Sequence, residues 1–328
     1  GSEIPMANFV AETFKTDHST FQISGKNIEE TVRQSITWHD EPFGDSANLP
    51  LFLISEKLKQ QGIKVILQGD GGDELFAGYP HYQGLNFLSA LKKIRPMIRP
   101  FLPLLPRTHF FTKAKQHFET LTDPSPELMH AYLLTPDRKE FITASCLSEG
   151  LREKLSASDR FQYYKTLYPG CQKADPAQRA LYLDYMILLQ HQFLEKVDRP
   201  TMANSIEVRV PFLGKELVEL ALGLPSRYKI HGTEKKYLLR QALRGIVPNK
   251  ILDAPKKGFG VPFDHWLKKD LLNLLQETMV KLNHQGLINK NLVDLKIQEH
   301  IQGTKNNGAA LWKLMQLGLW LDQYKIEL

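Results

Sequence analysis

The chain has 328 residues, of which 42% are hydrophobic and 24% are charged, and this balance excludes a largely disordered protein. No run of about 18 apolar residues occurs, so the sequence predicts no membrane span. The net charge of +6 is not gathered into a basic run, which argues against a specific nucleic-acid tract. The cysteines Cys146 and Cys171 have no metal-ligand spacing, and we therefore expect a cytoplasmic protein.

The first 85 residues alternate between strand and helix patterns. His18–Ser24 has the alternation of a strand, whereas Asn27–Trp38 has apolar residues at helical spacing. Leu49–Gln61 predicts a second helix that ends at Gly62. The short apolar run Ile63–Gln68 is typical of a buried parallel strand. Together these elements predict an α/β fold with a doubly wound parallel sheet.

Helical patterns dominate after residue 85. The strongest amphipathic segment is Tyr182–Asp198, in which apolar residues recur near one helical face. We therefore expect residues 1–85 to form an α/β part and residues 86–328 to be mainly helical. Further helices are predicted over Leu217–Leu222, Lys235–Leu243 and Leu311–Leu319.

A glycine-rich acidic turn, Gln68–Tyr79, directly follows the predicted buried strand. Ligands of doubly wound sheets bind beyond the carboxyl ends of the strands, and glycines let a ligand approach the backbone closely. Asp70, Asp73 and Glu74 crowd three carboxylates together, an arrangement that Mg²⁺ with a polyphosphate would stabilise. From these residues alone, an acidic surface turn with a capping Asp is an open alternative.

This turn resembles the second nucleotide-site motif of the asparagine synthetase family. Asp40–Ser46, Glu195–Leu213 and Pro255–Gly260 also resemble segments of that family. The matches cover about residues 5–270 in the family's order. The resemblance implies a sheet like that of the adenine nucleotide alpha hydrolases. It also implies a synthetase domain that activates the aspartate side-chain carboxylate with ATP and Mg²⁺, and then forms asparagine with ammonia.

The resemblance also implies roles for residues of the turn. The position of Asp73 holds Mg²⁺ and pyrophosphate, and that of Asp70 lies beside the amino group of the substrate. Gln68 and Gly69 match the pair that contacts ATP, although Gln68 replaces a more usual serine.

Two lysines complete the implied site. Lys256 matches the catalytic lysine of the family, and Lys236 matches a lysine that contacts pyrophosphate. On spacing alone, Lys236 would be a solvated helix-face charge and Lys256 one more basic loop residue.

Other polar residues have structural as well as catalytic interpretations. Asp198, Arg199, Glu207 and Arg209 could form an internal ion-pair network. Tyr79 could orient the nucleophile or lie in the core.

Two elements of the family have no counterpart in the sequence. These are the glutaminase domain, which begins with a catalytic cysteine, and the loop Ser-Gly-Gly-x-Asp-Ser. We therefore expect the chain, which begins Gly1-Ser2, to be a piece of a longer protein. Loss of a central strand would expose apolar edges, so we expect a chain that is less stable or pairs with another, and that has little activity alone.

The family resemblance and the missing elements leave three functions to consider. The first is the synthetase domain of a glutamine-dependent asparagine synthetase, with aspartate, ATP and ammonia from glutamine as small-molecule partners and a homodimer as an expected assembly. The second is an amidotransferase of the same family that acts on another carboxylate, such as a uronic acid of a surface polysaccharide. The third is a binding module without catalysis.

Overall fold

A computed structural model of the chain describes residues 4–21, 27–83, 85, 96, 97, 100, 142–159, 161–254 and 260–326. In its N-terminal part the elements are α1 (Ile4–Phe14), α2 (Ile28–Ser35), α3 (Asn48–Gln60), β1 (Val65–Leu67) and α4 (Gly72–Phe76).

The two helices predicted before β1 are confirmed as α2 and α3. The backbone at Gly62 is left-handed, with φ of 78°. The amide of Ile63 donates to the carbonyl of Leu58, and that of Gly62 to Lys59, which is the Schellman arrangement that ends a helix.

The sheet is small. β1 pairs in parallel with β2 (Glu207–Arg209), with Val65 opposite Glu207. The chain is therefore a mostly helical α/β protein with a short parallel sheet, and the wider doubly wound sheet stays a prediction. The predicted strand at His18–Ser24 is wrong for residues 18–21, which form no strand, and residues 22–24 lie outside the described part.

The predicted strand Ile63–Gln68 forms, but its predicted burial is wrong. Val65 is 42% exposed and Leu67 is 72% exposed. Among the described residues only β2 pairs with β1. Because Val65 and Leu67 point to the same face of the strand, that face carries an exposed apolar pair.

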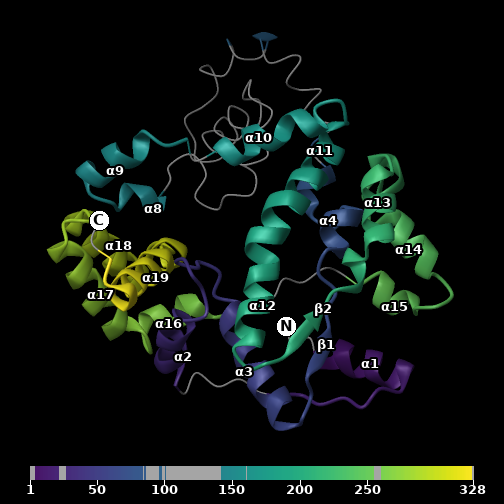
Figure 1. Cartoon of the computed structure of the whole chain (residues 1–328), viewed down its shortest axis with the longest axis horizontal. Helices are drawn as coiled ribbons and strands as arrows, with labels where there is room; N and C mark the ends of the chain where they lie inside the picture. The colour runs from purple at the N-terminus through teal and green to yellow at the C-terminus, as the bar shows by residue number, and fades with distance from the viewer. Residues whose placement is uncertain are drawn as a thin grey trace.

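A long helical rod runs through the middle of the molecule (Figure 1). It consists of α11 (Pro176–Leu183), the π-helix η2 (Asp184–Leu194) and α12 (Glu195–Met202), and it confirms the helix predicted over Tyr182–Asp198. Before it come α8 (Ile142–Ser145), α9 (Glu149–Ser156) and α10 (Gln162–Cys171).

In the described residues after β2, the regular elements are helices apart from one short antiparallel hairpin. The helices predicted over Leu217–Leu222 and Leu311–Leu319 are confirmed, whereas the one predicted over Lys235–Leu243 begins only at Tyr237, because Lys235 belongs to a strand. In chain order the elements are η3 (Pro211–Leu213), α13 (Lys215–Gly223), η4 (Ser226–Tyr228), β3 (Ile230–His231), β4 (Glu234–Lys235), α14 (Tyr237–Leu243), α15 (Asn249–Leu252), α16 (Phe263–Lys268), α17 (Leu272–His284), α18 (Lys290–Gln302) and α19 (Gly308–Tyr324).

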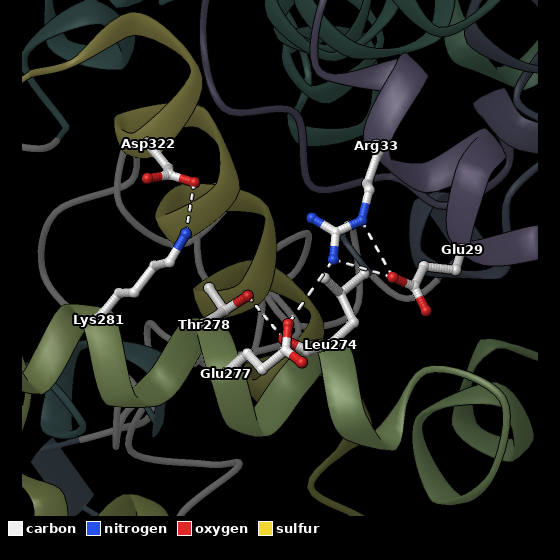
Figure 2. A network of polar contacts seen from close by, with 7 residues as sticks. All are labelled: Glu29, Arg33, Leu274, Glu277, Thr278, Lys281 and Asp322. Carbon is white, nitrogen blue, oxygen red and sulfur yellow. Dashed lines mark hydrogen bonds and ion pairs between the residues drawn. The ribbon is translucent and has the colours of Figure 1, made fainter.

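The largest hydrophobic core joins the N-terminal helices to the C-terminal ones. Val32 on α2 and Leu49 on α3 are fully buried in the same cluster as Leu311 on α19. Figure 2 shows the junction, where Arg33 of α2 lies 2.9 Å from Glu29 and 3.7 Å from Glu277 of α17. Residues from both sides of the predicted boundary at residue 85 therefore share one core.

Candidate active site

The turn after β1 is held from both ends. The amide of Gln68 donates to the carbonyl of Arg209 on β2 at 2.9 Å. Gly71 caps α4 with φ of 84°, and a Cβ there would lie 2.5 Å from Leu213 Cδ2. Glycine at position 71 therefore provides both the left-handed backbone and the close approach to η3.

The short helix α4 is anchored by its apolar residues. Leu75 and Phe76 are buried, and Phe76 makes an edge contact with Phe212 at 6.3 Å between ring centroids. The helix ends at Ala77, where φ is 60°, and the amide of Gly78 donates to the carbonyl of Asp73. This anchoring fixes the Asp73 and Glu74 side chains in the first turn of the helix.

Asp73 meets Lys236, far away in the sequence. Lys236 Nζ lies 3.0 Å from Asp73 Oδ1, and the two side chains are 29% and 22% exposed. Lys236 joins β4 to α14 with a left-handed backbone, φ 53°, a conformation that is unfavourable for a residue with a Cβ. The structure thus brings together two residues that sequence reasoning assigned to the pyrophosphate site.

Asp70 lies on the same turn beside a second lysine. Its Oδ2 atom is buried and has no hydrogen-bond partner within the described part of the chain. Burial raises the pKa of the Asp70 carboxyl, Lys196 opposes that rise, and Asp73 adds to it. Lys196 Nζ lies 3.5 Å from Asp45 Oδ2 and 4.5 Å from the centre of the Phe193 ring.

Tyr79 is half-buried and forms a hydrogen bond within the protein. Its hydroxyl donates to Glu74 Oε1 at 2.5 Å, and Glu74 is only 2% exposed. Burial is the main cause that raises the pKa of both Tyr79 and Glu74. This pairing favours the core interpretation of Tyr79.

Sequence reasoning missed a polar cluster around Asp184, the first residue of η2. Asp184 is fully buried and accepts a hydrogen bond from the Tyr82 hydroxyl, and His81 Nε2 lies 3.2 Å from the same carboxylate. The available signal was an acid among the apolar residues at the start of the segment Tyr182–Asp198, because an acid on a buried helix needs buried partners.

The residues proposed as an internal ion-pair network lie at the surface instead. Arg209 pairs with Glu207 at 2.7 Å, with the side chains 63% and 55% exposed. They are two apart on β2 and so share one face of the open sheet. Arg199 is also partly exposed and pairs with Glu195 at 2.7 Å and Asp40 at 3.0 Å.

The carboxylates of this turn could bind a magnesium ion that is also coordinated by the phosphates of a nucleotide. Among the described residues no three His, Cys, Asp or Glu side chains are arranged to hold a metal by themselves. Asp73 and Asp70 lie on one turn, and Mg²⁺ is usually held by one or two carboxylates with water and substrate phosphates. Gln68 and Gly69 precede them on this turn, whereas Lys256 lies outside the described residues.

No helix in the described ranges is long and apolar enough to cross a membrane.

The family model "Asparagine synthase" matches residues 1–322. A putative asparagine synthetase (glutamine-hydrolyzing) of Mycobacterium tuberculosis strain H37Rv is 31% identical over 97% of the chain and 48% of its own length. Asparagine synthetase (glutamine-hydrolyzing) 1 of Bacillus subtilis is 28% identical over 97% of the chain and 50% of its own length. An amidase of Penicillium rubens is 24% identical over 77% of the chain and 40% of its own length. The chain thus spans about half the length of the curated synthetases that it matches.

Proposed function

Because the chain belongs to the asparagine synthase family, we propose that it is a synthetase domain that amidates the side-chain carboxylate of aspartate with ATP. The observation that carries this proposal is the ion pair between Asp73 and Lys236. Asp73 lies with Asp70 on the turn after β1, and Lys236 reaches this turn from the start of α14. A carboxylate that can bind Mg²⁺ and an ammonium group that can contact phosphate oxygens, both at the carboxyl end of a parallel strand, suit a magnesium-bound polyphosphate.

The proposed reaction has two steps. A carboxylate oxygen of aspartate attacks the α-phosphorus of ATP, and pyrophosphate leaves. Ammonia then attacks the acyl carbon, a proton leaves the nitrogen, and AMP departs with the former carboxylate oxygen. Both leaving groups are anions, so the site must stabilise developing negative charge.

We assign the roles as follows. Asp73 holds Mg²⁺, which when bound neutralises charge on the phosphates. Lys236 and Lys256 contact the pyrophosphate, and Lys256 stabilises charge in both steps. Gln68 and Gly69 contact ATP, and Asp70 lies beside the amino group of the acceptor. The buried Oδ2 of Asp70, which has no hydrogen-bond partner among the described residues, supports this last role, since a buried carboxylate is costly without a donor.

The partners of the whole protein are part of the same proposal. The relatives are about twice as long as the chain, and their names contain "glutamine-hydrolyzing". We therefore propose that a glutaminase domain supplies the ammonia. We also propose a homodimer as the assembly. The division into a nucleotide-binding part at residues 1–85 and a helical part at 86–328 is likewise proposed as functional, although the two share a core.

A second candidate is an amidotransferase that acts on a carboxylate other than aspartate. The match to a relative named as an amidase favours this candidate, because family membership then does not fix the acceptor.

Transfer of isotope tests the proposed chemistry. The complete gene product is incubated with aspartate that carries ¹⁸O in its side-chain carboxylate, together with ATP, Mg²⁺ and ammonia. We expect AMP with one ¹⁸O atom, since the carboxylate oxygen leaves with the phosphate. Formation of asparagine together with unlabelled AMP would contradict adenylation. A folded protein that forms no AMP with any carboxylate would favour the binding module.

A further inference from the structure

Gly78 lies against the ion pair of the candidate site. A Cβ at this position would lie 1.6 Å from Asp73 Oδ1 and 2.4 Å from Lys236 Cε. Its backbone is outside the left-handed region, unlike that of Gly71. The requirement at position 78 is therefore one of space and not of backbone conformation.

Both sides of this contact are fixed by local structure. On one side, the left-handed Ala77 ends α4, and the amide of Gly78 donates to the carbonyl of Asp73 at 2.9 Å. This turn folds Gly78 back onto the Asp73 side chain. On the other side, Lys236 caps α14 with a left-handed backbone, and its amine reaches Asp73 Oδ1 at 3.0 Å.

We propose that Gly78 is a positioning residue of the site, because its missing side chain provides the space in which Asp73 and Lys236 meet. The proposal rests on the proposed function only in the consequence that nucleotide binding depends on this space. The atoms that a Cβ would strike belong to the ends of two side chains and not to backbone. A methyl group at position 78 therefore displaces the carboxylate and the amine and leaves the rest of the fold in place.

Nucleotide binding gives the first test. In the complete gene product we expect Gly78→Ala to weaken binding of Mg²⁺–ATP about tenfold or more, since both charged groups leave their places. Equilibrium dialysis with Mg²⁺–ATP measures this affinity without turnover. The matched control is Gly150→Ala in α9, where a Cβ meets nothing within 4 Å. An affinity of Gly78→Ala equal to that of the wild type would overturn the proposal.

A double-mutant cycle tests the proposal without any nucleotide. Asp73→Asn and Lys236→Met are made singly and together, first in the wild-type background and then with Gly78→Ala. In the wild-type background we expect the effects of the two substitutions on the unfolding midpoint to be non-additive. With Gly78→Ala we expect them to be additive. Equal coupling in both backgrounds would contradict the role of Gly78. A wild-type protein that binds no ATP but shows the expected change in coupling would contradict the proposed function alone.

A third variant covers a failure of Gly78→Ala to fold. Adding Lys236→Ala removes the Cε atom that would lie 2.4 Å from the new methyl group, and the vacated space lets the Asp73 carboxylate, whose Oδ1 would lie 1.6 Å away, move aside. We expect this double variant to regain part of the lost thermal stability. A double variant no more stable than Gly78→Ala, when Lys236→Ala alone folds normally, would contradict the steric argument.

Discussion

At the scale of single residues, the site depends on a contact that sequence spacing does not reveal. Lys236 looks like an ordinary helix-face charge in the sequence, and only the family resemblance placed it near Asp73. The structure shows the reason, because a left-handed backbone at Lys236 directs its amine to Asp73. The glycine-rich turn was predictable from the sequence, because glycines permit a left-handed backbone and close contacts. Gly71 has both, with φ of 84° and a close approach to η3.

The carboxylate of Asp73 is the residue-scale element that the proposed chemistry needs most. In the complete gene product we expect Asp73→Asn to lower kcat/KM for pyrophosphate release about 100-fold or more, because a neutral amide is a poor Mg²⁺ ligand. The control is Asp322→Asn, which changes a remote exposed carboxylate that pairs with Lys281 (Figure 2). Wild-type kinetics in Asp73→Asn would remove Asp73 from the site.

His39 predicts a pH dependence of stability. It is 4% exposed, stacks on Phe43 and lies 3.3 Å from Asn48 Nδ2. Burial lowers the pKa of His39 from 6.5 to about 4. The unfolded state therefore binds more protons between these values, and stability falls as the pH falls from 6.5 towards 4.

Below about pH 4 the lowered pKa of His39 reduces the free energy of unfolding by about 3 kcal/mol relative to pH 7, since each pKa unit corresponds to about 1.4 kcal/mol. Denaturant unfolding at several pH values between 7 and 4 measures it. We expect His39→Gln to be less stable at pH 7 but to lose less stability on acidification. Parallel pH curves for the two proteins would contradict this prediction.

At the scale of elements, helical periodicity predicted α2, α3, α12, α13, α14 and α19, because their apolar residues recur at helical spacing. It also predicted a helix over Tyr182–Asp198, but not that Asp184–Leu194 is the π-helix η2, whose buried Asp184 is stabilised by residues distant in the sequence. Strand prediction was weaker. His18–Ser24 has the right alternation, but residues 18–21 have no strand partner among the described residues.

The crossing of α17 and α19 depends on Gly318. A Cβ there would lie 2.3 Å from Thr278 Cγ2 and 3.1 Å from Leu282 Cγ. We expect Gly318→Ala to lower the free energy of unfolding by about 1–3 kcal/mol, since overpacking must move the helices apart. Chemical denaturation measures this change, with Gly150→Ala as the control. Equal stability of the two variants would contradict the close helix crossing.

At the scale of the whole molecule, the exposed apolar face of β1 is the main departure from expectation. The run Ile63–Gln68 reads as a buried strand, yet Val65 and Leu67 are exposed. A strand that is apolar on both faces is typical of the interior of a sheet. The sequence pattern thus predicts more neighbours for β1 than the described residues supply, and residue spacing alone could not show that Val65 and Leu67 are exposed.

This surface predicts self-association of the 328-residue chain. Among the described residues β1 pairs only with β2, and a strand that combines an unpaired edge with exposed apolar side chains is a template for pairing with another chain. We expect the wild-type chain to associate as its concentration rises, and Leu67→Lys to weaken that association. Sedimentation velocity measures the effect, with Leu220→Lys on α13, which is also exposed, as the control. A chain that stays monomeric at all concentrations would contradict the prediction.

The most direct test of the central claim is pyrophosphate release by the complete gene product with ATP, Mg²⁺ and ammonia. Aspartate is compared with a panel of other carboxylates, and asparagine is quantified in the same samples. We expect release that requires aspartate and that equals the amount of asparagine formed. A folded protein that releases pyrophosphate with another carboxylate, and not with aspartate, would contradict the claim that aspartate is the acceptor.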